Sequence, residues 1–140
     1  MGILEHLNRS PFRQLVGIEI TEIEDGYAEG RLELEHKHSS RQGQLIAQGG
    51  VAFTLADSVG GAAAISLEGR PTPTIDFRID YLRPGIDDLY ATGEVTRRGS
   101  ETAVVDVLIT DASENEIAVA RGVYKTSPLA TDAPWEIEDV

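Results

Sequence analysis

One long apolar segment in the middle of the chain limits the folds that the sequence can adopt. Between Arg41 and Glu68 the only charged residue is Asp57, and its neighbours are apolar or small. A helical segment that is apolar nearly all round is enclosed by other elements rather than laid on a surface. We therefore predict one buried helix that begins at 48–49 and ends at 68–69.

Most of the remaining chain alternates apolar and polar residues, which is typical of half-buried strands. The predicted strands are 18–23 and 27–35, which form a hairpin around Asp25-Gly26, then 72–82, and then 89–98, 101–111 and 116–126, which form an antiparallel meander. Residues 2–16 have the pattern of one or two short helical turns. We predict a single α+β domain over 1–127, in which an antiparallel β-sheet wraps around the long helix, and a loose acidic tail over 128–140 that Trp135 could dock.

Composition argues against several classes of function. The chain has no cysteine, so it has no disulfide framework, thiolate nucleophile or cysteine-ligated metal. His36 and His38 would share one face of a strand, but we interpret them as exposed polar positions and predict no metal site. The net charge of −12 argues against binding of nucleic acid.

The charge balance and the N-terminal residues lead to an expectation about the cellular setting. Lysine occurs only at Lys37 and Lys125, beside a large excess of acids. Such a surface favours a salt-adapted, halophilic host, and the alternative is an ordinary acidic cytosolic protein. The N-terminus lacks the pattern of a signal peptide, so we predict a cytoplasmic location. The stretch 45–67 is apolar enough to raise the question of a membrane, but Asp57 and its glycines favour a buried core helix.

Asp57 is the first candidate for chemistry. Burial of a carboxylate costs several kcal/mol unless the group is paired, hydrogen-bonded or protonated, so a lone acid in this segment indicates function. Gly49 and Gly50 precede it at the start of the helix, where free backbone N–H groups can hold a partial negative charge. An acid together with such donors outlines a site for acyl transfer or hydrolysis. The alternative is a structural, hydrogen-bonded aspartate.

Three motifs in order resemble the hotdog-fold acyl-CoA thioesterases of the phenylacetate-degradation (PaaI-like) type. That family has an Asn, a Gly, a His-Gly-Gly and then a Leu-Ala-Asp along one helix, and residues 42–57 match its spacing from the Gly-Gly pair to the acid. The run from Thr74 to Pro84 and the run from Val95 to Gly99 are similar to two further family segments. The resemblance extends over residues 10–126 and implies the hotdog fold.

The resemblance also implies a set of catalytic residues. These are Asp57 as general base or nucleophile, Gly49 and Gly50 as oxyanion donors, Gln42 in the place of the family Asn, Gln48 in the place of the family His, and Thr74 as a hydroxyl that helps to hold the water. Glutamine cannot titrate near neutral pH, so Gln48 can replace the histidine only where hydrogen bonding suffices. In this family the glycine donor and the acid of one site come from opposite subunits, which implies a homodimer as the minimal active unit and a homotetramer as the assembly.

A second set of residues is expected to bind the coenzyme A moiety of the substrate. Its members are Arg83, Arg97, Arg98, Gly99 and Ser100, which combine basic side chains with the backbone N–H groups of a turn. The alternative is that these arginines are solvated surface residues paired with acids. Phe53, Phe77 and Tyr81 line either an acyl pocket or the core.

The sequence thus predicts an acyl-CoA thioesterase that hydrolyses an aryl- or medium-chain acyl-CoA with Asp57 and water. No cofactor is expected beyond the coenzyme A of the substrate. One alternative is a hotdog protein that binds acyl-CoA without turnover, as a sensor or scavenger, which the replacements at Gln42 and Gln48 favour. A hydratase of the same fold would need an Asp and His pair, and no histidine follows His38. No Gly-x-Ser-x-Gly elbow is present, which leaves a serine hydrolase without support.

Overall fold

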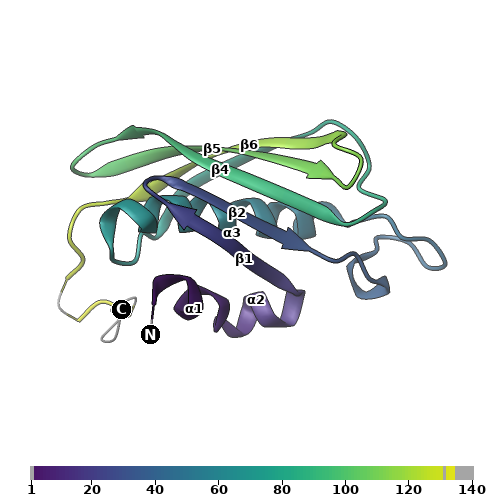
Figure 1. Cartoon of the computed structure of the whole chain (residues 1–140), viewed down its shortest axis with the longest axis horizontal. Helices are drawn as coiled ribbons and strands as arrows, with labels where there is room; N and C mark the ends of the chain where they lie inside the picture. Colours follow the sequence, from purple (N-terminus) through teal and green to yellow (C-terminus); the bar gives the residue numbers. More distant parts are fainter. Residues whose placement is uncertain (1, 131, 135–140) are drawn as a thin grey trace.

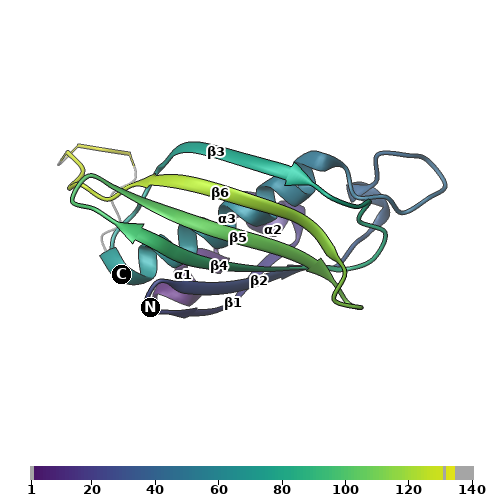
Figure 2. The ribbon, with the colours of Figure 1, turned by 90° about the horizontal axis from the view of Figure 1, so that it is seen from above.

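The computed structural model describes residues 2–130 and 132–134, in which six antiparallel strands form one sheet against the long helix α3 (Gly49–Glu68), as Figures 1 and 2 show. The strands are β1 (Ile18–Glu24), β2 (Tyr27–Leu32), β3 (Thr74–Tyr81), β4 (Leu89–Arg98), β5 (Thr102–Asp111) and β6 (Glu116–Lys125). The short helices are α1 (Ile3–Asn8), α2 (Pro11–Val16) and the 3-10 turn η1 (His36–His38). This arrangement is the predicted α+β hotdog fold.

The strand order β1-β2-β4-β5-β6-β3 places β1 and β3 at the two edges of the sheet. The hairpin of β1 and β2 and the meander of β4, β5 and β6 follow the sequence as predicted. Strand β3 pairs with β6, the last strand, and not with β4, which follows it in the chain. Within the described residues β3 therefore has a hydrogen-bonded neighbour on one side only.

The turn between β1 and β2 has the backbone that its sequence predicts. Asp25 has a φ of 43° and Gly26 a φ of 87°, so both central residues are left-handed, as a two-residue hairpin turn of the primed type requires. The Gly26 N–H donates to Ser66 Oγ at 2.7 Å, which ties the hairpin to the last turn of α3.

Small residues allow α3 to approach the sheet closely. The helix buries a row of alanines, and Val59 in its middle is fully buried. A Cβ atom at Gly30 of β2 would lie 2.6 Å from Val59 Cγ2, and one at Gly93 of β4 would lie 3.3 Å from Val59 Cγ1, so glycine at these strand positions sets the distance between the layers. Figure 1 shows α1 and α2 on the same side of the sheet as α3.

The ends of α3 agree with the predicted boundaries. Gln48 is the N-cap, and Gly69, with a φ of 67°, ends the helix in the left-handed conformation. By length and composition α3 could span a membrane, since an 18-residue stretch of it has a mean hydropathy of 1.4. Half of that stretch is buried inside the domain, as in a core helix.

His38 corrects the prediction that both histidines of the loop are exposed. It lies in the turn η1 rather than on a strand, and only 3% of it is exposed. Its Nδ1 accepts the Glu35 N–H at 2.9 Å and its Nε2 lies 2.5 Å from Val16 O, so both ring nitrogens are paired in the neutral form. Its main-chain oxygen accepts the Gln48 N–H at 2.9 Å, which anchors the start of α3. The predicted docking of Trp135 lies outside the described residues.

Candidate active site

The carboxylate of Asp57 faces the edge of the sheet where β3 begins and β6 ends. Thr74 Oγ1 donates to Asp57 Oδ1 at 2.9 Å, and the Tyr124 hydroxyl lies 3.0 Å from the same oxygen. Asp57 is half-buried. The structure thus brings together Asp57 and Thr74, which the sequence named, with Tyr124, which it did not.

Tyr124 is completely buried beneath α3. Burial, and then the charge of Asp57, raise the pKa of the Tyr124 phenol well above its ordinary value, so it is a neutral hydrogen-bond donor at any working pH. No sequence signal distinguishes Tyr124 from an ordinary aromatic residue of a strand, because its role depends on a contact with a residue 67 positions away.

Arg13 of α2 is the second residue that the sequence analysis missed. Its Nη1 donates to Leu7 O at 3.1 Å, while its Nε is buried with no hydrogen-bond partner among the described residues. Burial lowers the pKa of the Arg13 guanidinium, and the negative charge of Asp57 opposes that shift. Because an arginine remains protonated in proteins, Arg13 of α2 places a positive charge within range of Asp57.

The first turn of α3 presents a free backbone donor. Gln48 Oε1 accepts the Gly50 N–H at 2.5 Å, and the Tyr81 hydroxyl donates to Gly49 O at 2.6 Å, so both ends of the peptide between Gly49 and Gly50 are fixed. The Gly49 N–H donates to no residue of the described part of the chain. A cavity of about 380 Å³ lies at this turn and is lined in part by Gly49, Tyr81 and Arg83.

One protomer does not bring the donor and the acid together. Gly49 and Asp57 are eight residues apart on the same helix, and at a rise of about 1.5 Å per residue this separates them by about 12 Å along the axis. Gln42 is exposed in the loop before α3 and makes no hydrogen bond to any residue that the structure describes. Within a single chain the expected donor and the expected acid therefore stay apart.

The expected coenzyme A residues fall at two ends of the sheet. Arg83 follows β3 at the end where β4 begins, and its Nη1 donates to Asn115 Oδ1 at 3.1 Å. Arg97 and Arg98 end β4, about 30 Å away at about 3.3 Å per strand residue. Arg98 Nε forms an ion pair of 3.1 Å with Glu68. The Gly99 N–H donates to Thr102 O at 2.8 Å, and Ser100 is exposed.

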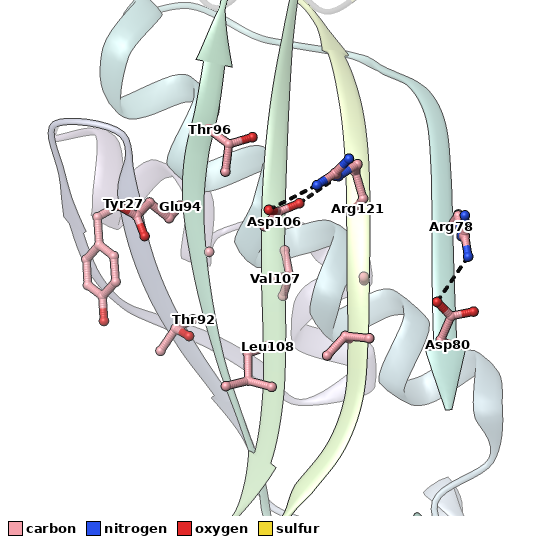
Figure 3. A pocket seen from close by; sticks show the side chains of 13 residues that line it. Tyr27, Arg78, Asp80, Thr92, Glu94, Thr96, Asp106, Val107, Leu108 and Arg121 are labelled. Carbon is pink, nitrogen blue, oxygen red and sulfur yellow. Dashed lines mark hydrogen bonds and ion pairs between the residues drawn. The ribbon is translucent and has the colours of Figure 1, made fainter. Parts of the chain in front are cut away.

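A hollow of about 610 Å³ lies on the outer face of the sheet, the face turned away from α3 (Figure 3). Four of its charged side chains are paired with one another: Arg121 Nε lies 2.7 Å from Asp106, and Arg78 lies 3.2 Å from Asp80. Exposed ion pairs of this kind hold no reactive group and add little stability. Over residues 2–130 and 132–134, no group of three or more His, Asp or Glu side chains could hold a metal ion.

Comparison with known proteins defines the class of protein. The family model described as "Thioesterase superfamily" matches residues 46–118, which run from the loop before α3 into β6. The protein VNG_1336C of Halobacterium salinarum is 32% identical over 123 residues, which cover 79% of this chain and 80% of that protein. The acyl-coenzyme A thioesterase PaaI of Escherichia coli is 31% identical over 109 residues, which cover 76% of each chain.

Solved structures agree with this class. The structure of E. coli PaaI superposes with a TM-score of 0.80 at 25% identity and covers 89% of each chain. The protein smu.793 of Streptococcus mutans, solved with acetyl CoA bound, gives a TM-score of 0.72 at 29% identity and covers 79% of this chain and 89% of its own. The chain belongs to the thioesterase superfamily. It is a PaaI-like thioester hydrolase with the hotdog fold.

Proposed function

We propose that the protein is an acyl-CoA thioesterase in which Asp57 of one protomer works with the Gly49 N–H of a second copy. One observation carries the proposal: a half-buried carboxylate is held at Oδ1 by two hydroxyls, and no described residue donates to its Oδ2. The unpaired Gly49 N–H at the start of α3 supplies the matching donor. The named activity of E. coli PaaI and the acetyl CoA bound to smu.793 support the substrate class.

In the general-base route, Asp57 Oδ2 takes a proton from water as the water oxygen bonds to the thioester carbonyl carbon. The carbonyl oxygen gains negative charge and accepts the Gly49 N–H of the second copy. The C–S bond then breaks, and the sulfur of coenzyme A takes the proton from Asp57, which leaves the free acid. In the nucleophilic route, Oδ2 itself bonds to the carbonyl carbon, the coenzyme A thiolate leaves, and water cleaves the resulting anhydride. Hydroxylamine would trap that anhydride as a hydroxamate.

The geometry of β3 supports the pairing of two copies. Thr74, at one end of β3, contacts Asp57, and Tyr81, at the other end, contacts Gly49. A two-fold axis through the open edge of β3 would pair it with its own copy in antiparallel fashion, so that Thr74 meets Tyr81 of the second copy. Asp57 would then lie near the Gly49 of the second copy. Each homodimer would hold two complete sites.

The same pairing gives roles to the other predicted residues. Gln48 shapes the first turn of α3 as its N-cap, and Gln42, in the loop before it, would supply a second hydrogen bond to the carbonyl. Arg83 lines the cavity beside Gly49. In the antiparallel dimer, Arg83 of the second copy would lie near the end of the sheet at which the first copy carries Arg97 and the turn 98–100. This placement supports a coenzyme A site shared by two subunits.

Aromatic side chains beside Asp57 support an aryl or medium-chain acyl group. Phe53 lies four residues before Asp57 on α3 and therefore on the same helix face. Its ring packs edge-to-face on Phe77 of β3, with centroids 4.9 Å apart. Both side chains are half-buried and present an apolar wall next to the acid.

The proposal extends to the setting of the enzyme. We propose that no metal or bound cofactor takes part, that dimers pair into a homotetramer, and that the protein works in the cytoplasm of a salt-adapted cell. The net charge of −12 supports the last of these, because screening by salt relieves repulsion among surface acids.

Thiol release from benzoyl-CoA, octanoyl-CoA and acetyl-CoA tests the function, with Asp57→Asn as the variant. Asparagine keeps an oxygen that can accept from Thr74 and Tyr124 but cannot take a proton, so we expect kcat to fall by about 10²- to 10⁴-fold. Equal turnover by the wild type and Asp57→Asn would overturn the role of Asp57. Binding of these acyl-CoAs without turnover by the wild type would replace the enzyme with an acyl-CoA-binding protein.

A further inference from the structure

We propose that Tyr124 is a positioning residue of this site: its buried hydroxyl, together with Thr74, holds Asp57 Oδ1 and leaves Oδ2 as the oxygen that acts. This inference rests on the proposed function and assigns separate tasks to the two carboxylate oxygens. Thr74 approaches from the first residue of β3 and Tyr124 from the penultimate residue of β6, so two strands converge on one oxygen.

The single proton of the Tyr124 hydroxyl has two acceptors within reach, both on Asp57. Oδ1 lies at 3.0 Å and the main-chain oxygen at 3.1 Å. The main-chain oxygen is already an acceptor within α3, and the carboxylate carries the charge. A hydrogen bond to an ionised acceptor is the stronger of the two, so the proton goes to Oδ1.

The space that the Tyr124 hydroxyl occupies exists because two neighbouring residues are glycines. A Cβ atom at Gly60 of α3 would overlap the hydroxyl oxygen, and one at Gly122 of β6 would lie 2.8 Å from it. Any side chain at either position would push the ring away from Asp57. The absence of both Cβ atoms, on two different elements, indicates that the position of the phenol is fixed by the fold and does not depend on the substrate.

The hold on Oδ1 determines which oxygen is available. Among residues 2–130 and 132–134 no side chain or backbone group donates to Oδ2, and Oδ2 is not among the fully buried atoms that lack a partner. It therefore reaches solvent, where water or a thioester carbonyl can approach it. Because one oxygen of the carboxylate is fixed, the other cannot rotate away from the reacting atoms. The reacting oxygen is therefore oriented before the substrate binds.

The test measures thiol release from benzoyl-CoA and octanoyl-CoA by the full-length wild type, Tyr124→Phe and Thr74→Val. Tyr27→Phe is the matched control, because it removes the same atom from a tyrosine on the outer face of the sheet. A hydrogen bond to a charged group corresponds to a rate factor of about 10- to 100-fold, so we expect Tyr124→Phe to lose that much in kcat while KM stays within about twofold. Tyr27→Phe should keep the wild-type kcat.

The outcomes separate this inference from the proposed function. Turnover by the wild type and its loss in Asp57→Asn would support the function alone, and wild-type kcat in Tyr124→Phe would then overturn the positioning role. A rise in KM with unchanged kcat would also overturn it, because the residue would then serve binding. If circular dichroism shows that Tyr124→Phe is unfolded, the kcat of Thr74→Val tests the hold on Asp57 Oδ1 instead, because Thr74 binds the same oxygen. Thr74 is exposed on the edge strand, so its substitution leaves the core intact. No thiol release by the wild type from any acyl-CoA would remove both proposals.

Discussion

The hydroxyl of Tyr81 donates to the main-chain oxygen of Gly49 at 2.6 Å, across the gap between the end of β3 and the start of α3. With the Gln48 side chain on the Gly50 N–H, it fixes both ends of one peptide. The preceding peptide carries the free Gly49 N–H, and its own carbonyl, Gln48 O, accepts the Val51 N–H at 2.9 Å. A donor that is aimed before substrate arrives costs no reorganisation during the reaction.

Tyr81→Phe should therefore reduce turnover without unfolding the protein. The tyrosine is half-exposed, so the loss of its hydroxyl removes one neutral hydrogen bond and leaves the core intact. Such a bond is worth about 1 kcal/mol, which corresponds to a fall in kcat of about fivefold. Tyr90→Phe, which removes an exposed hydroxyl from β4, is the control for steady-state kinetics. Equal kcat for both variants would show that the Gly49 peptide is held without Tyr81.

Gln48→Glu should change stability and turnover in opposite directions. The carboxylate can still accept the Gly50 N–H, and a negative charge at a helix N-terminus stabilises the helix by about 0.5 kcal/mol. In the proposed site the same charge would lie beside the developing oxyanion, so kcat should fall by at least about tenfold. Gln48→Ala, which removes the cap, should instead lose about 1 kcal/mol of unfolding free energy. Urea unfolding and thiol release on both variants check these signs, and a parallel loss of stability in Gln48→Glu would contradict the capping role.

Sequence patterns predicted the elements better than the contacts between them. The helix around Asp57, the turn at Gly26 and the β4–β6 meander follow from local periodicity and turn chemistry, which neighbouring residues determine. The pairing of β3 with β6 does not, because either edge of the meander could accept it.

Some residues of the site could likewise be predicted from the sequence, and others could not. Asp57 and Gly49 stand out in the sequence because a lone acid and a Gly-Gly pair are unusual in an apolar helix. Tyr124 and Arg13 look like ordinary strand and helix residues, and only the fold brings Tyr124 into contact with Asp57 and Arg13 within range of its charge. His38 was misjudged because the burial of a polar ring depends on partners such as Val16 O, which come from another element.

High pH should reveal the hydrogen bond between Tyr27 and Glu29. The Tyr27 hydroxyl donates to Glu29 Oε1 at 2.5 Å, and this bond, followed by burial, raises the pKa of Tyr27 to about 12 from its ordinary value near 10. A group whose folded pKa is raised contributes stability that is complete below its unfolded pKa and is lost as the pH rises through the folded one. The stability advantage of the wild type over Tyr27→Phe should therefore shrink between pH 10 and 12. Urea midpoints across this range measure it, and a constant gap would contradict the assignment.

The adjacent glycines Gly60 and Gly61 offer a matched pair of substitutions on α3. A Cβ atom at Gly60 would overlap the Tyr124 hydroxyl and lie 3.3 Å from Val107 Cγ2, whereas one at Gly61 would meet Tyr124 Cε1 at an ordinary 3.5 Å. Gly60→Ala should therefore destabilise the protein by about 1–3 kcal/mol through overpacking. Gly61→Ala should be neutral or stabilise it by up to about 1 kcal/mol, because alanine is the better helix former.

The two variants should also differ in activity. Relief of the overlap in Gly60→Ala moves the Tyr124 ring, which weakens the hold on Asp57 Oδ1, so kcat should fall well below that of Gly61→Ala at a temperature where both are folded. Thermal unfolding followed by circular dichroism, together with thiol release at that temperature, provides both readouts. Equal losses in the two variants would mean that the helix backbone is sensitive to any added side chain and that the space around the phenol is not what requires glycine at position 60. A selective loss in Gly60→Ala would tie the packing of this helix turn to the orientation of the carboxylate.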